Sequence, residues 1–190
     1  MEKSRNIASR TLCSGRFLAL EELTYRDETG AIRRWESCVR ARSTPAVMLV
    51  PIIRPGNKIV LIRQFRPPTG RYVWETPAGL MEQGEKPEET ALRELYEETG
   101  YTAVITKVLP PSFSSCGLSG ESVHIVFADI DGNRYGDALP VSHPDAGEQI
   151  AVHPVALEKL SEHLENAIAA GDAVDSKLLL LAALTASGRV

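Results

Sequence analysis

The pattern of hydrophobic and polar positions divides the chain into predicted strands and helices that alternate irregularly. Hydrophobic or alternating runs bounded by turn residues predict strands at 17–25, 32–40, 47–53, 58–63, 104–109 and 123–130, with a short strand-like run at 150–152. We expect helices at 85–99, 155–169 and 176–186. This mixture predicts a layered α/β domain and argues against a helical bundle or an all-β barrel.

Two regions of the chain, 1–40 and 131–148, have weaker patterns. Residues 1–13 carry Lys3, Arg5 and Arg10 without a clear period, so we expect a loosely held start. A turn that ends at Gly30 joins the strands at 17–25 and 32–40, which indicates a hairpin that packs against the rest of the chain or a second subunit. Residues 131–148 show no period and contain several Gly and Pro residues, which is typical of a lid or binding loop.

The segment 85–99 carries the clearest helix signal. Pro87 fits the first turn, where a missing N–H costs nothing, and Glu88 and Glu89 favour the positive N-terminal end. An apolar stripe at three- and four-residue spacing follows, and Gly100 ends the helix as a C-terminal cap. The sequence therefore predicts an amphipathic helix in this segment.

Composition narrows the class of protein. The 190 residues are 43% hydrophobic and 24% charged, as in ordinary globular domains, so the chain is long enough for one stable core. A net charge of −4, with no basic patch that contains interleaved aromatics, argues against nucleic acid as a partner. Three cysteines without C-x-x-C spacing and the lack of a long apolar segment predict a cytoplasmic protein with no membrane partner.

An acidic cluster within the predicted helix is the first candidate for chemistry. Glu94, Glu97 and Glu98 are three and four residues apart, so their carboxylates lie on one face of the helix. Hard divalent cations such as Mg²⁺ prefer oxygen ligands of this kind. Arg93, one position earlier, is expected to point about 100° away from this face. The alternative is a solvated face on which Glu89, Arg93 and Glu97 form ordinary i,i+4 ion pairs.

The segment 79–101 extends this cluster into a longer motif. It matches G-x5-E-x7-R-E-U-x-E-E-x-G-U, in which U is a bulky apolar residue, at all seven fixed identities. This pattern resembles the signature of the Nudix hydrolase family. Lys86 replaces the common Thr or Ser at the helix N-cap, and Tyr101 replaces an aliphatic residue. Both departures concern stability more than chemistry.

Other segments resemble the ADP-ribose (ADP-sugar) pyrophosphatase branch of this family. They are 35–37, 64–68, 74–80 and 119–121, and their order and spacing agree from about residue 17 to the C-terminal helices. The resemblance implies a Nudix α/β/α sandwich with a mixed sheet and an N-terminal antiparallel hairpin region. It also implies a homodimer, in which residues 1–43 serve dimerisation and base stacking and residues 44–190 form the hydrolase domain.

The resemblance also implies a metal site. Its ligands would be three carboxylates and one carbonyl: Glu94, Glu97, Glu98 and Ala78. The expected cofactor is Mg²⁺, two or three ions, with Mn²⁺ as a substitute. A pyrophosphate diester brings about two negative charges to these carboxylates, so bound cations are needed to make the encounter favourable and to polarise the P–O bonds. Glu85 and Arg93 would be partners that orient the loop and the helix.

The general base is expected in a late loop, because this branch of the family uses a Glu outside the box. Glu148 stands at the end of the 131–148 loop, before the strand-like run at 150–152, and is the first choice. Glu121 is the second choice. A solvated loop glutamate without a catalytic role is the alternative for either residue.

Substrate contacts are expected from two regions. Arg66, near a strand end, is a candidate for phosphate or ribose contact, as is Arg40, and Glu75 belongs to the same substrate-binding set with Glu121. The alternative for each Arg is an ordinary surface position. Trp35 and Phe17 are candidates to stack on adenine, and their alternative is an ordinary core or dimer-interface role.

These features predict Mg²⁺-dependent hydrolysis of the pyrophosphate bond of ADP-ribose or a related ADP-sugar, giving AMP and a sugar phosphate. One alternative is a diphosphatase for GDP-mannose or another nucleotide sugar, which would differ at the hairpin and the 114–121 loop and not at the metals. A second alternative is a catalytically silent sensor that binds ADP-ribose. Such proteins generally lose box carboxylates, and this sequence retains all of them.

Overall fold

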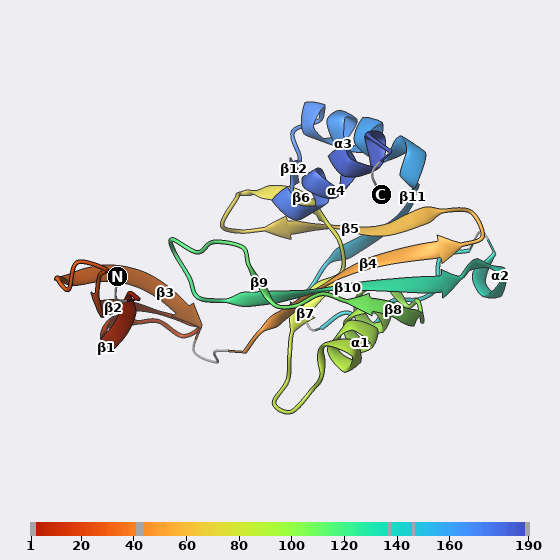
Figure 1. The fold of residues 1–190 in the computed structure, drawn as a ribbon. Helices are drawn as coiled ribbons and strands as arrows, with labels where there is room; N and C mark the ends of the chain where they lie inside the picture. The colour runs from red at the N-terminus through yellow and green to blue at the C-terminus, as the bar shows by residue number, and fades with distance from the viewer. Residues whose placement is uncertain (1–2, 41–43, 137, 146, 189–190) are drawn as a thin grey trace. The chain divides into compact units, whose positions relative to one another are not determined.

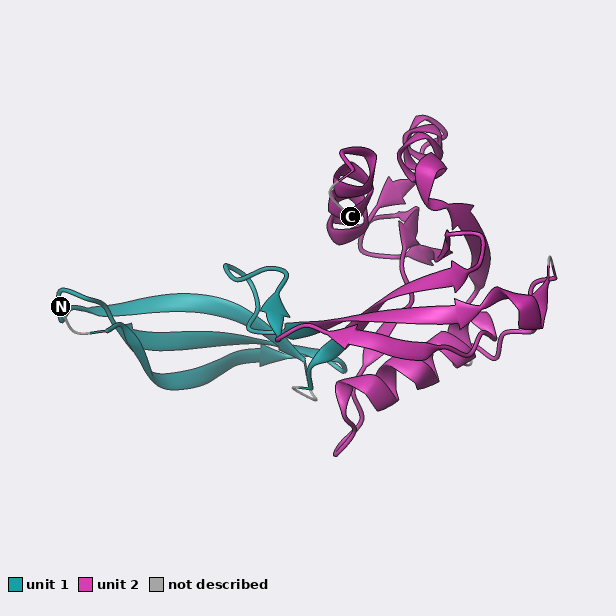
Figure 2. Cartoon of the chain, turned by 45° about the vertical axis from the view of Figure 1, so that its right-hand side comes forward, with its two compact units in different colours: residues 1–46, 111–123 teal, residues 47–110, 124–190 magenta. Residues whose placement is uncertain are grey.

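The computed structural model describes residues 3–40, 44–136, 138–145 and 147–188. The chain divides into two compact units (Figure 2). The first contains residues 1–46 and 111–123, and the second contains residues 47–110 and 124–190. The assignment of dimerisation and base binding to residues 1–43 stays a prediction.

The first unit is built on a three-stranded antiparallel sheet, in the order β1-β2-β3. The predicted hairpin is confirmed as β2 (Leu18–Arg26) and β3 (Ile32–Arg40). Its turn is held by Asp27, whose carboxylate accepts the backbone N–H of Thr29 at 2.9 Å and that of Ala31 at 3.0 Å. β9 (Ser112–Phe113) pairs with the first two residues of β10 (Ser122–Asp131).

The expectation of a loosely held start at residues 1–13 is wrong, because β1 (Arg5–Ser14) pairs with β2 along its length. All ten residues of β1 are exposed in this chain. A strand with no buried face has no reason to alternate hydrophobic and polar residues, so its sequence gives no period-two signal.

The second unit contains a mixed sheet. Its main path is β12-β6-β5-β4-β10-β8, with β11 beside β5 and β7 beside β4. The pairings of β5 with β4, β6 and β11 and of β10 with β8 are antiparallel, and β12 is parallel to β6. The strands not yet given are β4 (Ala46–Arg54), β5 (Lys58–Arg66), β6 (Arg71–Glu75), β7 (Ala78–Leu80), β8 (Val104–Val108), β11 (Ile150–Ala156) and β12 (Ala173–Val174).

Helices cover both sides of this sheet. Figure 1 shows α1 (Pro87–Thr99) on one side of the strands and α3 (Leu160–Ala169) and α4 (Ser176–Ala186) on the other. The predicted α/β/α sandwich with a mixed sheet is therefore confirmed. The side of α1 that faces the sheet contributes Ala91 and Leu95, which are fully buried against Val47, Leu49 and other strand residues.

On the opposite side, polar contacts join the C-terminal segment to the sheet. Arg63 of β5 forms a bidentate pair with Asp172, with N–O distances of 2.6 and 2.8 Å. The Trp74 indole N–H donates to the same carboxylate at 2.9 Å. The Trp74 ring also packs against the rings of His153 and His163, at centroid distances of 4.7 and 4.5 Å. These contacts fix α3 and β12 to strands β5 and β6.

Several predicted boundaries need correction. The helix expected at 155–169 begins only at Leu160, because β11 continues to Ala156 through its pairing with β5 and a 3₁₀ turn, η1 (Leu157–Lys159), follows. The helix expected at 85–99 begins at Pro87. The 131–148 loop contains a short helix, α2 (Gly132–Tyr135), and the strands β6 and β7 were not predicted.

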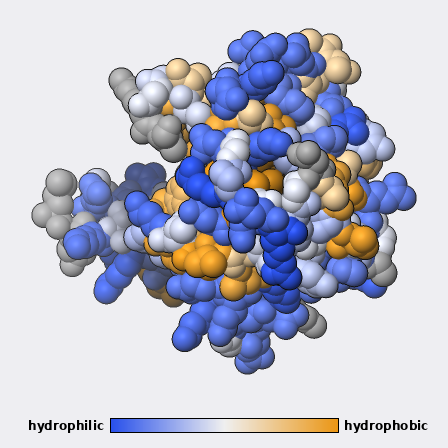
Figure 3. Space-filling model, turned by 90° about the vertical axis from the view of Figure 1, so that its right-hand side faces the viewer, coloured by the Kyte–Doolittle hydropathy of each residue, from blue (hydrophilic) through white to orange (hydrophobic). Residues whose placement is uncertain are grey.

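The surface of the molecule is mostly polar on the face shown in Figure 3, where hydrophobic residues gather in separate patches. None of the helices that the structure describes is long and apolar enough to cross a membrane.

Candidate active site

The start of α1 positions the glutamates that follow it. Pro87 occupies the first helical position, and the Glu89 carboxylate accepts the Lys86 backbone N–H at 2.8 Å. At the other end, Gly100 adopts a left-handed conformation, with φ of 74°, and its N–H donates to the Tyr96 carbonyl at 2.8 Å. Both ends of the helix are therefore capped, which fixes the register of the residues between them.

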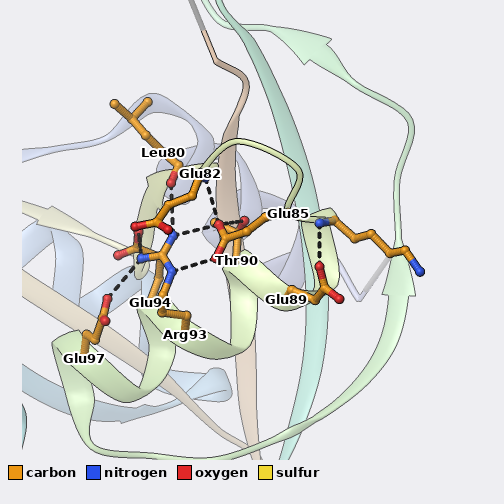
Figure 4. Close-up of polar contacts among 9 residues, drawn as sticks. Leu80, Glu82, Glu85, Glu89, Thr90, Arg93, Glu94 and Glu97 are labelled. Atoms are coloured by element: carbon orange, nitrogen blue, oxygen red, sulfur yellow. Dashed lines mark hydrogen bonds and ion pairs between the residues drawn. The ribbon is translucent and has the colours of Figure 1, made fainter. Parts of the chain in front are cut away.

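Arg93 lies at the centre of a network of ion pairs (Figure 4). Its guanidinium donates to the two oxygens of Glu85, each at 3.0 Å, and to the Leu80 carbonyl at 3.1 Å. It also donates to Glu94 at 2.8 Å and to Glu97 at 3.1 Å. The expectation that Arg93 points away from these glutamates is wrong, because its long side chain curves back to the face that they share.

Glu85 connects this network to the loop that precedes α1. Its carboxylate accepts the Glu82 backbone N–H at 2.8 Å and the Thr90 hydroxyl at 2.7 Å. The hydrogen bonds from Arg93, Glu82 and Thr90 lower the pKa of Glu85 to about 2. Glu85 and Arg93 are thus brought together as predicted. Thr90 was not singled out in the sequence, because no charge or motif marks it.

Two carboxylates of α1 are held in a partly desolvated region. Glu98 is only 4% exposed, and its carboxylate accepts the Ala78 backbone N–H at 3.1 Å. Burial and the neighbouring Glu94 carboxylate raise the pKa of Glu98 to about 9. Burial also raises the pKa of Glu94. Burying two charged carboxylates together is unfavourable unless a proton or a cation compensates their charge.

Gly79 lies against the Glu94 carboxylate. A Cβ added at position 79 would overlap all three atoms of that carboxyl group. Gly79 is a fixed residue of the sequence motif, but the reason for the glycine is visible only in the fold. It leaves space for Glu94 between β7 and α1.

The donor set is suited to a hard divalent cation. Arg93 donates to one oxygen of Glu94 and to one oxygen of Glu97, and the Ala78 N–H donates to one oxygen of Glu98. In the described part of the chain, the second oxygen of each carboxylate is left for a cation. Within the described ranges, no three acidic side chains already converge on one point. The residue types fit a metal site.

Glu148 and Arg66 lie close enough to this cluster to act on it electrostatically. Glu148 raises the pKa of both Glu94 and Glu98, and Arg66 lowers the pKa of Glu98, although burial is the largest influence on both groups. Arg66 is the last residue of β5 and forms a bidentate pair with Glu75, at 2.7 and 3.0 Å. The structure thus brings Glu148, Arg66 and Glu75 to the same region as the box carboxylates.

The other predicted substrate residues lie in the first unit. Arg40 and Glu121 form a close ion pair, and the Trp35 indole N–H donates to the Gly117 carbonyl at 3.0 Å. The Trp35 ring remains 51% exposed, and Phe17 is 69% exposed. Core burial within this chain is therefore not the role of either aromatic. The fold brings the 114–121 loop to β3, a contact that the sequence did not predict.

Comparison with known proteins agrees with this geometry. The NUDIX domain family matches residues 42–174. The chain is 38% identical over 154 residues to the ADP-sugar pyrophosphatase of Mus musculus, a match covering 77% of this chain and 71% of that protein. It is 30% identical over 184 residues to the ADP-ribose pyrophosphatase of Saccharomyces cerevisiae, covering 93% and 79%. A crystal structure described as an ADP compounds hydrolase superposes with a TM-score of 0.70 over 100% of this chain and 98% of that one, at 24% identity, and shows the same fold.

Proposed function

This chain belongs to the Nudix family, and we propose that it hydrolyses the pyrophosphate bond of ADP-ribose or a related ADP-sugar, giving AMP and a sugar phosphate. The observation that carries the proposal is the carboxylate cluster of α1, ordered by Arg93 and Glu85 and close to Glu148. The relatives named ADP-sugar and ADP-ribose pyrophosphatase support the substrate class.

The carboxylates of α1 are the proposed cation ligands. Glu94, Glu97 and Glu98 would hold two or three Mg²⁺ ions, with the Ala78 carbonyl as a further ligand and Mn²⁺ as a substitute. When bound, such ions offset the charge of the pyrophosphate, polarise its P–O bonds and help to activate water. Arg93 keeps the Glu94 and Glu97 carboxylates in place, and Glu85 holds Arg93.

Glu148 is the proposed general base. Its carboxylate would take a proton from a water molecule whose oxygen attacks one phosphorus atom of the pyrophosphate. The P–O bond to the bridging oxygen then breaks, and that oxygen leaves with the electron pair on the other phosphate. The proximity of Glu148 to Glu94 and Glu98 supports this role, and Glu121 remains the second candidate.

Several charged and aromatic residues are proposed as substrate contacts. The guanidinium of Arg66 is a proposed contact for phosphate or ribose, oriented by Glu75, and Arg40 is a second such contact, paired with Glu121. The exposed Trp35 and Phe17 rings would stack on adenine. We further propose that residues 1–43 form the contact of a homodimer, and that the protein is cytoplasmic, in keeping with its free cysteines.

Turnover of purified protein tests the proposal directly. ADP-ribose, GDP-mannose and ATP are each incubated with Mg²⁺ or with EDTA, and anion-exchange chromatography then separates and quantifies the nucleotide products. Hydrolysis of ADP-ribose that EDTA abolishes is the expected result. A preference for GDP-mannose would keep the proposed hydrolysis and overturn the assignment of adenine as the nucleobase that the protein binds. Binding of ADP-ribose without turnover of any substrate would contradict the proposed hydrolase and favour a catalytically silent sensor.

A further inference from the structure

The C-terminal end of α1 is crossed by residues 139–143, which we call the strap. The His143 backbone N–H donates to the Glu97 carbonyl at 2.7 Å. The His143 ring stacks on the Tyr96 ring, with a centroid distance of 5.2 Å and an interplanar angle of 27°. A Cβ at Gly100 would overlap the Val141 carbonyl, so the strap passes directly over the helix cap. Three separate contacts therefore join the strap to α1.

Each contact stabilises the C-terminal end of the helix in a different way. The last carbonyls of a helix lack intrahelical partners, and the strap supplies one of the missing donors to Glu97. Gly100 permits both the left-handed cap and the close approach of Val141. Tyr96 and His143 are exposed side chains, and their stacking covers one face of each ring.

The strap leads directly to Glu148. Glu148 follows His143 by five positions, and the Glu148 backbone N–H donates to the Asp145 carbonyl at 3.0 Å. Beyond Glu148, β11 begins at Ile150, which pairs with Gln64 of β5. Glu148 is thus held between two fixed points, the strap on α1 and the first residue of β11.

We propose that Tyr96 and His143 are positioning residues that hold the segment carrying Glu148 beside the carboxylates of the same helix. The inference rests on the proposed function, because it gives the strap the task of placing the general base. It goes beyond that function by naming two residues outside the family motif's fixed positions. A base displaced by about 1 Å loses on the order of 100-fold in rate, so a stacking contact of this kind affects turnover strongly.

Kinetics of variants at Tyr96 test this assignment. Tyr96→Ala removes the ring, and we expect kcat on ADP-ribose to fall about 10- to 100-fold while KM changes less than about 2-fold. Tyr96→Phe retains the ring and is expected to restore most of kcat. Leu92→Ala, a truncation of an exposed residue one turn earlier on α1, is the matched control and is expected to keep wild-type kcat. An unchanged kcat in Tyr96→Ala would overturn the inference.

Two further measurements separate this inference from the proposed function. If Tyr96 acts through the base, Tyr96→Ala causes no additional loss in the Glu148→Gln background, whereas an independent loss in the double variant overturns the role. Amide hydrogen exchange needs no activity. We expect faster exchange at residues 143, 145 and 147–149 in Tyr96→Ala than in wild type and in Tyr96→Phe. Unchanged exchange there would reject the positioning role even in a protein that hydrolyses ADP-ribose, and faster exchange would support it even if ADP-ribose were not the substrate.

Discussion

The carboxylate of Glu94 lies against Gly79, so closely that a methyl group on the glycine would occupy the same space. The two residues come from different elements, β7 and α1, and meet where the strand passes the helix. The motif therefore requires a glycine at its first position because the Glu94 carboxylate needs the space, and not because of a left-handed backbone.

Replacing this glycine tests the importance of the Glu94 position. We expect Gly79→Ala to displace the end of the Glu94 side chain and to lower kcat on ADP-ribose about 100-fold or more. Because the displaced group is the tip of a flexible side chain, the midpoint of thermal unfolding should change little. Gly15→Ala is the control, since its Cβ would meet the Leu18 carbonyl oxygen at an ordinary 3.4 Å. If Gly79→Ala keeps the wild-type kcat, turnover does not depend on the exact position of the Glu94 carboxylate.

The Glu85–Arg93 pair predicts a pH-dependent contribution to stability. Its hydrogen bonds lower the pKa of Glu85 from 4.5 to about 2, so the stabilisation is complete above about pH 4.5 and is lost as the pH falls towards 2. We expect Glu85→Gln to lower the free energy of unfolding by about 1–3 kcal/mol at pH 7 and by clearly less at pH 3. Urea unfolding at both pH values measures this difference, with Glu88→Gln as an exposed control on the same helix. An equal loss at pH 7 and pH 3 would contradict the ionic origin.

The sequence predicted those parts of the site that depend on local spacing. The helix cap at Gly100, the apolar side of α1 with Leu95, and the glutamates at three- and four-residue spacing all follow from a single helical period. The pairing of Glu85 with Arg93 was also correct, because the motif fixes their separation. The buried central strands were also predicted, because a continuous hydrophobic run bounded by turn residues is itself a local signal.

The features that the sequence did not reveal depend on contacts between distant segments. β1 has no buried face, so its residues carry no period. β11 extends through Pro154 and Val155 because β5 pairs with it, although these residues precede a helix. The stacking of His143 on Tyr96 joins residues 47 positions apart, and nothing in the local pattern of either residue marks the contact.

Glu98 provides the most direct test of the proposed cation site. A glutamine at this buried position has nearly the same volume and still accepts the Ala78 N–H, so Glu98→Gln should fold normally. It loses a charged ligand, and we expect kcat to fall about 100-fold or more. We also expect Mg²⁺ to raise the melting temperature of the wild type, and to raise that of Glu98→Gln less. Unchanged turnover together with an unchanged Mg²⁺ effect would refute the metal role of this residue.

The general base is decided by comparing two glutamates in different units of the chain. We expect Glu148→Gln to lower kcat on ADP-ribose by about 10²- to 10⁴-fold with little change in KM, because proton abstraction is lost and binding is kept. Glu121 forms an ion pair with Arg40, so Glu121→Gln should act mainly on KM by releasing a proposed substrate contact. Steady-state kinetics of both variants, with saturating Mg²⁺, separates the two effects. If Glu121→Gln lowers kcat more than Glu148→Gln does, the base belongs to the first unit, and the carboxylate beside Glu94 and Glu98 has another role.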